Sequence, residues 1–210
     1  MKALGKATLA ASLVTITGGL AYYFYERSTE QPRYRLTLSD GQFEVRDYAR
    51  LLVAETAHAG SRREALNRGF RDLAGYIFAK SRGGEKIPMT APVVQDRQKI
   101  AMTAPVIEDM GDNGMWRTRF IMPAKYDRQT LPTPPSGVTL SEIPARRVAA
   151  IKFSGSGEDQ ALKEREANLR EWIGARQLRP IGPAEYAFYN SPFIPPFMRR
   201  NEILIPIATD

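Results

Sequence analysis

Cysteine is absent from the 210-residue sequence, and histidine occurs once, as His58. Without thiols the chain has no disulfide framework, no zinc–thiolate site and no covalent c-type haem attachment. A single imidazole also excludes a metal centre built from several histidines. We find no Ser-His-Asp set, no phosphate-cradling glycine loop and no close pair of carboxylates in a glycine- or proline-marked cleft. We therefore expect that the protein is not an enzyme.

The net charge of the chain is moderate, at +7. Its basic residues are scattered among acidic ones along the sequence. A nucleic-acid footprint would need basic residues clustered on one element, so we interpret the charge as a solvated surface and expect no nucleic-acid partner. Such a surface still favours an anionic ligand or a membrane. The hydrophobic content of 43% suffices for one domain with a real core, alone or with an appendage.

The first 25 residues differ from the rest of the chain. Lys2 and Lys6 precede nineteen uncharged residues, 7–25, which end in the aromatic cluster Tyr22-Tyr23-Phe24-Tyr25. This segment is long enough to cross a bilayer, with the lysines inside and the tyrosines at the far interface. A cleaved signal peptide shares the basic start, and Gly19-Leu20-Ala21 offers a poor cleavage site for one. A buried core helix is the third interpretation.

We favour an uncleaved anchor over residues 1–25, followed by a polar linker over residues 26–33. The folded domain is then expected over residues 34–210, in a periplasm-like compartment outside the cytoplasm. Cleavage of the segment would instead secrete the domain into the same compartment. The oligomeric state is left open.

An octapeptide occurs twice, as Lys86-Ile-Pro-Met-Thr-Ala-Pro-Val93 and Lys99-Ile-Ala-Met-Thr-Ala-Pro-Val106. Apolar residues stand at alternate positions in each copy, which is the spacing of a strand. The prolines place each copy at a sheet edge or before a bend. We expect residues 94–98 to be a hairpin loop that pairs the two copies and sets Val93 opposite Ile100.

Hydrophobic periodicity predicts several further strands and two helices. The expected strands cover residues 43–48, 51–58, 115–122, 138–142, 145–154 and 203–207. The expected helices cover residues 61–80, with Ser61 as N-cap, and about 158–176. A proline-rich stretch, residues 123–137, is expected to be an ordered loop between two halves.

The two halves align without a gap over eighteen residues at an offset of 95. Val53 corresponds to Val148, and the closing Gly60 corresponds to Gly155. This match predicts a duplicated unit of strand, strand, helix and strands. Its two copies are expected to share one sheet, with the helices packed against a face.

The segment before the last strand is unusually apolar for a loop. Three prolines accompany four large apolar side chains, Phe193, Ile194, Phe197 and Met198. Exposed loops rarely hold so many such groups unless they cover something, so this loop is a candidate wall of a binding site.

Four groups of short motifs occur in order along the chain. They are the Lys-Ile-x-Met-Thr-Ala-Pro-Val peptide, Phe120-Ile-Met-Pro123, Phe153-Ser-Gly155, and Tyr189-Asn-Ser-Pro192 with Arg199-Arg-Asn-Glu202. Together they resemble the SOUL haem-binding proteins, over residues from about 34 to 207. The resemblance implies an α+β fold in which a duplicated unit forms a distorted antiparallel β-barrel or sheet with two flanking α-helices. Gyrase-inhibitor-like effector-binding domains share this topology.

The resemblance also implies non-covalent binding of haem or another tetrapyrrole in an apolar groove between the first helix and the proline-rich loop. The matching helix face is Asn67, Phe70, Arg71 and Ala74, and the matching loop residues are Phe193 and Ile194. Phe70 keeps the bulk that such a groove needs. The family's basic positions fall on Asn67 and Gly75, which leaves neighbouring Arg68 and Arg71 to meet a propionate.

An axial ligand is not evident. Some family members carry a histidine, proposed as the haem ligand, where this chain has Asp47, and aspartate is a poor ligand for haem iron. His58 is the one imidazole that remains, although a histidine at a strand end is more typical of a surface residue. Met89 and Met102 carry thioethers, but we interpret them as core residues.

Two other functions fit the same residues. The domain could be a binding module for another amphipathic small molecule, as the effector-binding relatives suggest. It could also be an envelope structural or interaction protein whose pocket is vestigial. Pigment in the purified protein, or displacement of a fluorescent hydrophobic dye by haemin, would separate these alternatives.

Overall fold

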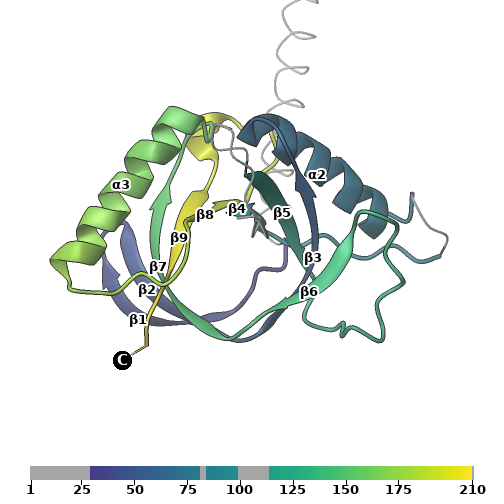
Figure 1. The fold of residues 1–210 in the computed structure, drawn as a ribbon, viewed down its shortest axis with the longest axis horizontal. Helices are drawn as coiled ribbons and strands as arrows, with labels where there is room; N and C mark the ends of the chain where they lie inside the picture. Colours follow the sequence, from purple (N-terminus) through teal and green to yellow (C-terminus); the bar gives the residue numbers. More distant parts are fainter. Residues whose placement is uncertain (1–28, 81–83, 99–113, 210) are drawn as a thin grey trace, which may run out of the picture. The chain divides into compact units, whose positions relative to one another are not determined.

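The computed structural model describes residues 29–80, 84–98 and 114–209. From Gln31 onward these residues form nine strands of one antiparallel sheet and two α-helices that pack on it (Figure 1). The predicted membrane segment, residues 7–25, lies outside the described residues. Among the helices that are described, none is long and apolar enough to cross a membrane.

The strands follow an order in space that differs from their order in sequence. Across the sheet they are β1 (Tyr34–Asp40), β2 (Phe43–Tyr48), β7 (Arg146–Phe153), β9 (Asn201–Ile207), β8 (Glu185–Phe188), β4 (Val93–Gln98), β5 (Met115–Ile121), β3 (Leu51–His58) and β6 (Thr139–Ile143). The sheet stays open, with β1 at one end and β6 at the other. Of the two predicted forms, a distorted barrel or a distorted sheet, the structure therefore has the open sheet.

The register of the sheet confirms the duplication. Tyr48 on β2 pairs with Arg146 on β7, and Leu51 on β3 pairs with Ile143 on β6. Leu51 and Arg146 are separated by the predicted offset of 95, and so are Tyr48 and Ile143. The two halves thus pair with each other in the same register, and β4 lies against β8 at the centre of the symmetric arrangement.

The two helices occupy equivalent places in the halves. α2 (Arg62–Ile77) packs on β3 and β5, and α3 (Asp159–Ala175) packs on β7 and β9 (Figure 1). α2 begins with a capping box: the Ser61 hydroxyl accepts from the Glu64 N–H, and the Glu64 carboxylate accepts from the Ser61 N–H. Such a box satisfies backbone donors at the helix start, as the sequence predicted for Ser61.

Each helix closes its own apolar core against the sheet. The core beneath α2 includes Ala54, Leu73, Tyr76, Ile77 and Phe120. The core beneath α3 includes Ile151, Leu162, Leu169, Ile173 and Ile203. Burial of these side chains supplies most of the driving force that holds helices to sheet.

The expected hairpin between the two octapeptides is wrong. Residues 94–98 belong to β4, whose edges are both occupied, since Val93 lies opposite Phe120 on β5 and Phe188 on β8. Val93 therefore has no free edge for Ile100. Residues 86–92 have no ladder pairing, and their alternation arises because side chains such as Ile87 pack into the α2 core. The second copy lies outside the described residues.

Candidate functional site

The predicted helix residues share one exposed face of α2. Asn67, Phe70 and Arg71 are exposed and Ala74 is half-buried, as expected from their three- and four-residue spacing. Phe70 is 39% exposed, and its ring lies edge-on to Phe120 with centroids 5.3 Å apart. The Phe70 ring is thus anchored by the core on one side and open on the other.

A close approach between α2 and β5 places this face. The neighbouring residue, Gly69, lies so near β5 that an added Cβ would stand 2.6 Å from the Thr118 hydroxyl oxygen. Only glycine permits this separation, because any side chain would have to displace the buried Thr118. The α2 face therefore has a fixed height above the sheet.

The proline-rich loop between β8 and β9 presents aromatic rings to solvent. Phe193 is 87% exposed, whereas Ile194 is 3% exposed and packs inside the loop. The Arg199 guanidinium donates to the carbonyl oxygens of Ile194 at 2.6 Å and Pro192 at 2.8 Å. Of the two predicted loop residues, Phe193 is thus open to a ligand and Ile194 supports the loop from beneath.

One turn between β7 and α3 contacts both parts of the predicted groove. Its Gly155 N–H donates to Pro196 O of the loop at 2.9 Å. Its Gly157 carbonyl accepts from Nη2 of Arg62, in the first turn of α2, at 2.8 Å. Arg62 Nε also lies 2.5 Å from the Asp159 carboxylate at the start of α3. The structure therefore ties the Phe193 loop to α2 through the helix's first turn.

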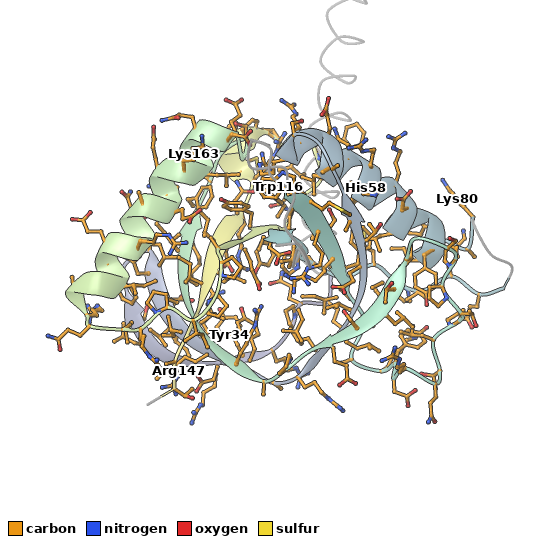
Figure 2. All side chains as sticks on the ribbon, viewed as in Figure 1. Tyr34, His58, Lys80, Trp116, Arg147 and Lys163 are labelled. Carbon is orange, nitrogen blue, oxygen red and sulfur yellow. The ribbon has the colours of Figure 1, made fainter. Side chains whose placement is uncertain are left out.

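His58 is engaged by the helix above it. On β3 it lies opposite Trp116 (Figure 2). Its Nε2 is 2.9 Å from Asp72 Oδ2 on α2. The described part of the chain contains no cluster of three or more His, Asp or Glu side chains arranged to hold a metal ion.

Asp47 is likewise occupied. Arg147 donates to its carboxylate through Nε at 2.7 Å and Nη2 at 3.0 Å, and Arg35 donates at 2.7 Å. The hydrogen bonds from Arg147 and then from Arg35 lower the pKa of Asp47 well below its ordinary value. The Asp47 carboxylate is therefore engaged by these two arginines.

The sheet face opposite the helices holds a cluster of buried charges that the sequence did not predict. Arg46 on β2 donates to both carboxylate oxygens of Glu202 on β9, at 2.7 and 3.0 Å, and to Glu44 at 2.6 Å. The Tyr189 hydroxyl donates to Glu202 at 2.7 Å. Burial alone raises the pKa of Glu202, but the hydrogen bonds and charges of Arg46 and Arg200 outweigh it, so the pKa is lowered.

A second buried cluster lies on the same face, nearer β4 and β5. Arg146 donates to both oxygens of Glu185 at 2.6 and 2.7 Å. Asp96 accepts from Arg117 at 2.6 Å and lies 3.1 Å from Arg119. Burial raises the pKa of Glu185, but Arg146 and the other arginines lower it more, so the pKa falls below its ordinary value. Glu185 is therefore ionised and unsuited to act as a general acid at neutral pH.

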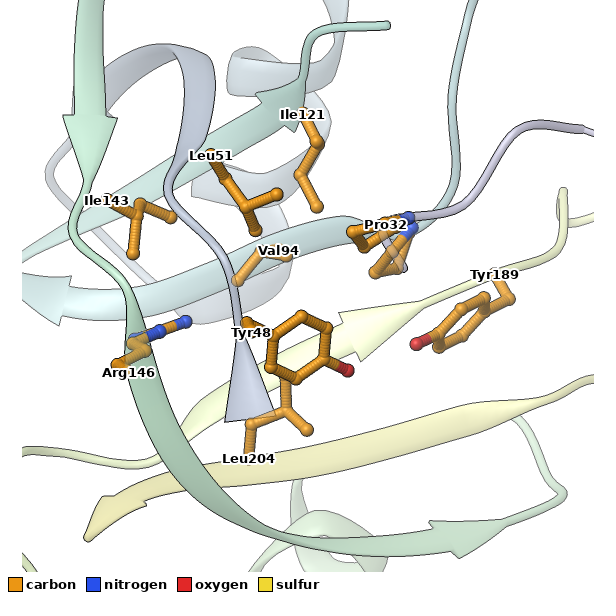
Figure 3. Close-up of a pocket in the computed structure, with 10 residues that line it drawn as sticks. Pro32, Tyr48, Leu51, Val94, Ile121, Ile143, Arg146, Tyr189 and Leu204 are labelled. Carbon is orange, nitrogen blue, oxygen red and sulfur yellow. The ribbon is translucent and has the colours of Figure 1, made fainter. Parts of the chain in front are cut away.

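A small pocket on this face borders both clusters, because Tyr189 of the first and Arg146 of the second are in its lining (Figure 3). Its lining consists of Pro32, Tyr48, Leu51, Pro92, Val94, Ile121, Ile143, Arg146, Tyr189 and Leu204. The volume of about 20 Å³ has room for a water molecule or two, not for a macrocycle. Among the described residues, Arg146 Nε is buried without a hydrogen-bond partner.

One signal could have revealed this inner face. Glu44, Arg46 and Tyr48 alternate with apolar Val45, and Arg117 and Arg119 alternate in the same way on β5. Alternation separates the two faces of a strand, but it does not say which face meets water. The expectation of a solvated surface for these charges is therefore wrong for Arg46 and Arg119, which are 0% and 4% exposed.

The sequence of the chain matches one known protein family. Residues 29–206 match the model of the family described as SOUL heme-binding protein. Among curated proteins, none matches the chain in sequence.

Solved structures share the fold at low sequence identity. The C-terminal domain of EcmrR superposes with a TM-score of 0.60 at 11% identity, covering 80% of this chain and 98% of that chain. EcmrR in its complex with DNA gives 0.59 at 11% identity, over 96% and 66% of the two chains. A hydrolase from Listeria innocua gives 0.53 at 10% identity, over 82% and 94%. At this level of identity the likeness concerns the fold alone.

Proposed function

The chain belongs to the SOUL haem-binding protein family, and on that premise we propose that its domain binds haem or a related tetrapyrrole without a covalent link. The observation that carries the proposal is Phe193, a phenylalanine that is 87% exposed on a loop held in place by Arg199. A rigid loop that keeps an aromatic ring in water is suited to stack on a planar ligand.

We place this ligand on the outer surface of α2 and the Phe193 loop, because the inner pocket, at about 20 Å³, is too small for a macrocycle. Phe70 offers a half-exposed ring on α2, and Arg71 keeps a guanidinium on the same exposed face, where it can pair with a propionate. Burial of a few hundred Å² of porphyrin at roughly 25 cal/mol per Å² contributes several kcal/mol before ordering costs. Stacking and burial therefore suffice without a strong axial bond.

Among the described residues, the two side chains considered as iron ligands are already engaged by other partners. Nε2 of His58 is held by Asp72, and Asp47 is held by two arginines. The exposed residues of α2 and the loop offer aromatic rings to the face of a tetrapyrrole and a guanidinium to its propionates. We infer that these residues bind the macrocycle and that iron coordination contributes little.

A titration of haemin into the purified protein, followed in the Soret region, tests the proposal. The expected result is a saturable spectral shift at micromolar protein. Absence of a saturable shift would overturn it.

A second candidate function is the binding of another amphipathic small molecule at the inner face. The favouring observation is the pocket itself, in which the apolar side chains of Leu51 and Val94 stand beside Tyr48 and the unpartnered Nε of Arg146. The pocket would have to enlarge to hold such a molecule. Displacement of a hydrophobic dye by small amphipathic acids, but not by haemin, would favour this function.

We also infer that residues 7–25 anchor the chain in a membrane and leave the domain outside the cytoplasm. The support is their length without charge, the preceding lysines and the closing aromatic cluster. Extraction of membranes with alkaline carbonate tests the anchor, and release of the chain into the soluble fraction would contradict it. N-terminal sequencing of the mature protein tests whether the segment is cleaved.

A further inference from the structure

Two phenylalanines stand out on the surface of the described domain. Phe193 and Phe197, in the loop between β8 and β9, are 87% and 77% exposed. Ile181, the next most exposed large apolar residue of the described chain, is 60% exposed. Neighbouring aromatic rings left in water are typical of a surface that meets an apolar partner.

The loop holds these rings outward by its own hydrogen bonds. The Met198 N–H donates to Pro195 O at 2.9 Å and closes the short helix η1 (Pro196–Met198). Arg199 donates to Ile194 O and Pro192 O, and Ile194 fills the inside of the loop. Phe193 and Phe197 are therefore exposed on a loop that is held in place by its own hydrogen bonds.

The polypeptide enters the folded domain at the base of the same loop. Gln31 is the first residue of the domain, and its side-chain oxygen accepts from Arg200 Nη1 at 3.2 Å. Arg200 is in turn held by two bonds to Glu202, at 2.7 and 3.0 Å. Arg200 follows Phe197 by three residues. The point of entry and the aromatic loop thus share one anchoring arginine.

The length of the preceding chain limits how far this point can lie from a membrane. The predicted span ends at Tyr25, six residues before Gln31. Six residues reach at most roughly 20 Å when fully extended. If residues 7–25 cross a bilayer, Arg200 and the loop base lie close to the interface where the span ends.

We propose that the loop carrying Phe193 and Phe197 docks on the lipid surface of the membrane that anchors the chain, with the Phe197 ring inserted at the interface and the Phe193 ring left to face the tetrapyrrole. Aromatic and aliphatic side chains on a rigid support are suited to this region of a bilayer. The loop is then a second point of attachment that orients the domain. This proposal rests on the predicted span and not on tetrapyrrole binding.

The test uses the full chain reconstituted into vesicles of phosphatidylcholine and phosphatidylglycerol. A Phe197→Trp variant reports contact with lipid when the acyl chains are brominated, because bromine quenches nearby tryptophan. Emission from the native Trp116 and Trp172 is subtracted by means of the wild-type chain. The matched control is Ile181→Trp, since Ile181 is also exposed and its N–H donates to Pro206 O, toward the opposite end of β9 from the loop.

The proposal predicts that the added tryptophan at position 197 is quenched several-fold more than the one at position 181. Equal quenching at the two positions would overturn it, as would failure of the chain to float with the vesicles. A Phe70→Asp change on α2 should weaken haemin binding and leave the quenching at position 197 unchanged. Failure of lipid docking and failure of haem binding are therefore distinguishable.

Discussion

Arg46 and Glu202 form a bidentate ion pair in which neither side chain is exposed to solvent. The two guanidinium-to-carboxylate distances are 2.7 and 3.0 Å, and 156 residues separate the partners in sequence. The pair links β2 to β9 across β7, which lies between them in the sheet. Because β2 belongs to the first repeat and β9 to the second, this contact helps to hold the two halves together.

Loss of one member of this pair should be far more harmful than loss of both. Arg46→Met leaves the Glu202 carboxylate buried without its main partner, so we expect the free energy of unfolding to fall by about 3–5 kcal/mol. The double change Arg46→Met with Glu202→Met should recover much of that loss. Urea denaturation of the single and double variants measures the effect. Strictly additive losses would show that the pair is not coupled.

Acid should destabilise the domain through the same carboxylates. The pKa of Glu202 is lowered from its ordinary value of 4.5 in the folded state, and that of Glu185 is lowered as well. Their contribution is therefore present above about pH 4.5 and is lost as the pH falls through the folded-state pKa. Urea midpoints measured at decreasing pH should fall below about pH 4.5, and Glu202→Gln should flatten that fall. An unchanged slope in the variant would contradict the assignment.

The close contact between α2 and β5 can be tested with alanine at two glycines. Gly69→Ala should destabilise the domain by about 1–3 kcal/mol, because its Cβ would stand 2.6 Å from the buried Thr118 hydroxyl. Gly174→Ala on α3 is the matched control, since its added Cβ has no neighbour within 4 Å beyond the adjacent residues and the backbone of its own helix. There alanine should stabilise by about 0.5 kcal/mol through helix propensity. Thermal unfolding of both variants measures these changes in stability. Equal changes in the two variants would contradict the close contact at Gly69.

Local patterns were sufficient for the elements that face a core. The predicted helix at residues 61–80 and the predicted strand at 145–154 correspond to α2 and β7. Two strands were missed: β1 is an exposed edge strand, and the four residues of β8 follow a loop and precede another. The sequence predicts a hairpin loop where β4 lies, because the partners of β4, β5 and β8, are far away in sequence and only the tertiary fold supplies them.

The candidate site was predictable to a smaller extent. The family resemblance, not a sequence period, pointed to Asn67, Phe70, Arg71 and Ala74, and the structure places them on exposed or half-buried positions of α2. The burial of Ile194 depends on hydrogen bonds that Arg199 makes within the loop, and no sequence period encodes them. The sequence does not predict the buried charges of the inner face, because an alternating pattern does not identify which side of a strand faces solvent.

His58 provides a test of how haem would be held. Its Nε2 is engaged by Asp72, so we expect His58→Ala to leave the Soret maximum of a haemin complex unchanged. The variant's absorption spectrum with bound haemin is the measurement, with the wild-type complex recorded beside it. A displaced Soret maximum in the variant would identify His58 as an axial ligand.

The central claim is that the outer surface formed by α2 and the Phe193 loop binds a tetrapyrrole. The most direct measurement is a haemin titration of the wild type, Phe193→Ser and Phe70→Asp, with Ile181→Ser as control. Phe193 is 87% exposed, so its replacement removes a stacking surface with little effect on the fold, whereas Phe70 also contacts Phe120. Circular dichroism checks that each variant remains folded.

The expected result is saturable binding by the wild type and the Ile181→Ser control, and affinity about tenfold weaker in Phe193→Ser, because part of the buried aromatic area is lost. Phe70→Asp should weaken binding further, since it places a negative charge where the macrocycle would lie. No saturable Soret shift in the wild type, or a shift that neither phenylalanine variant alters, would contradict the claim.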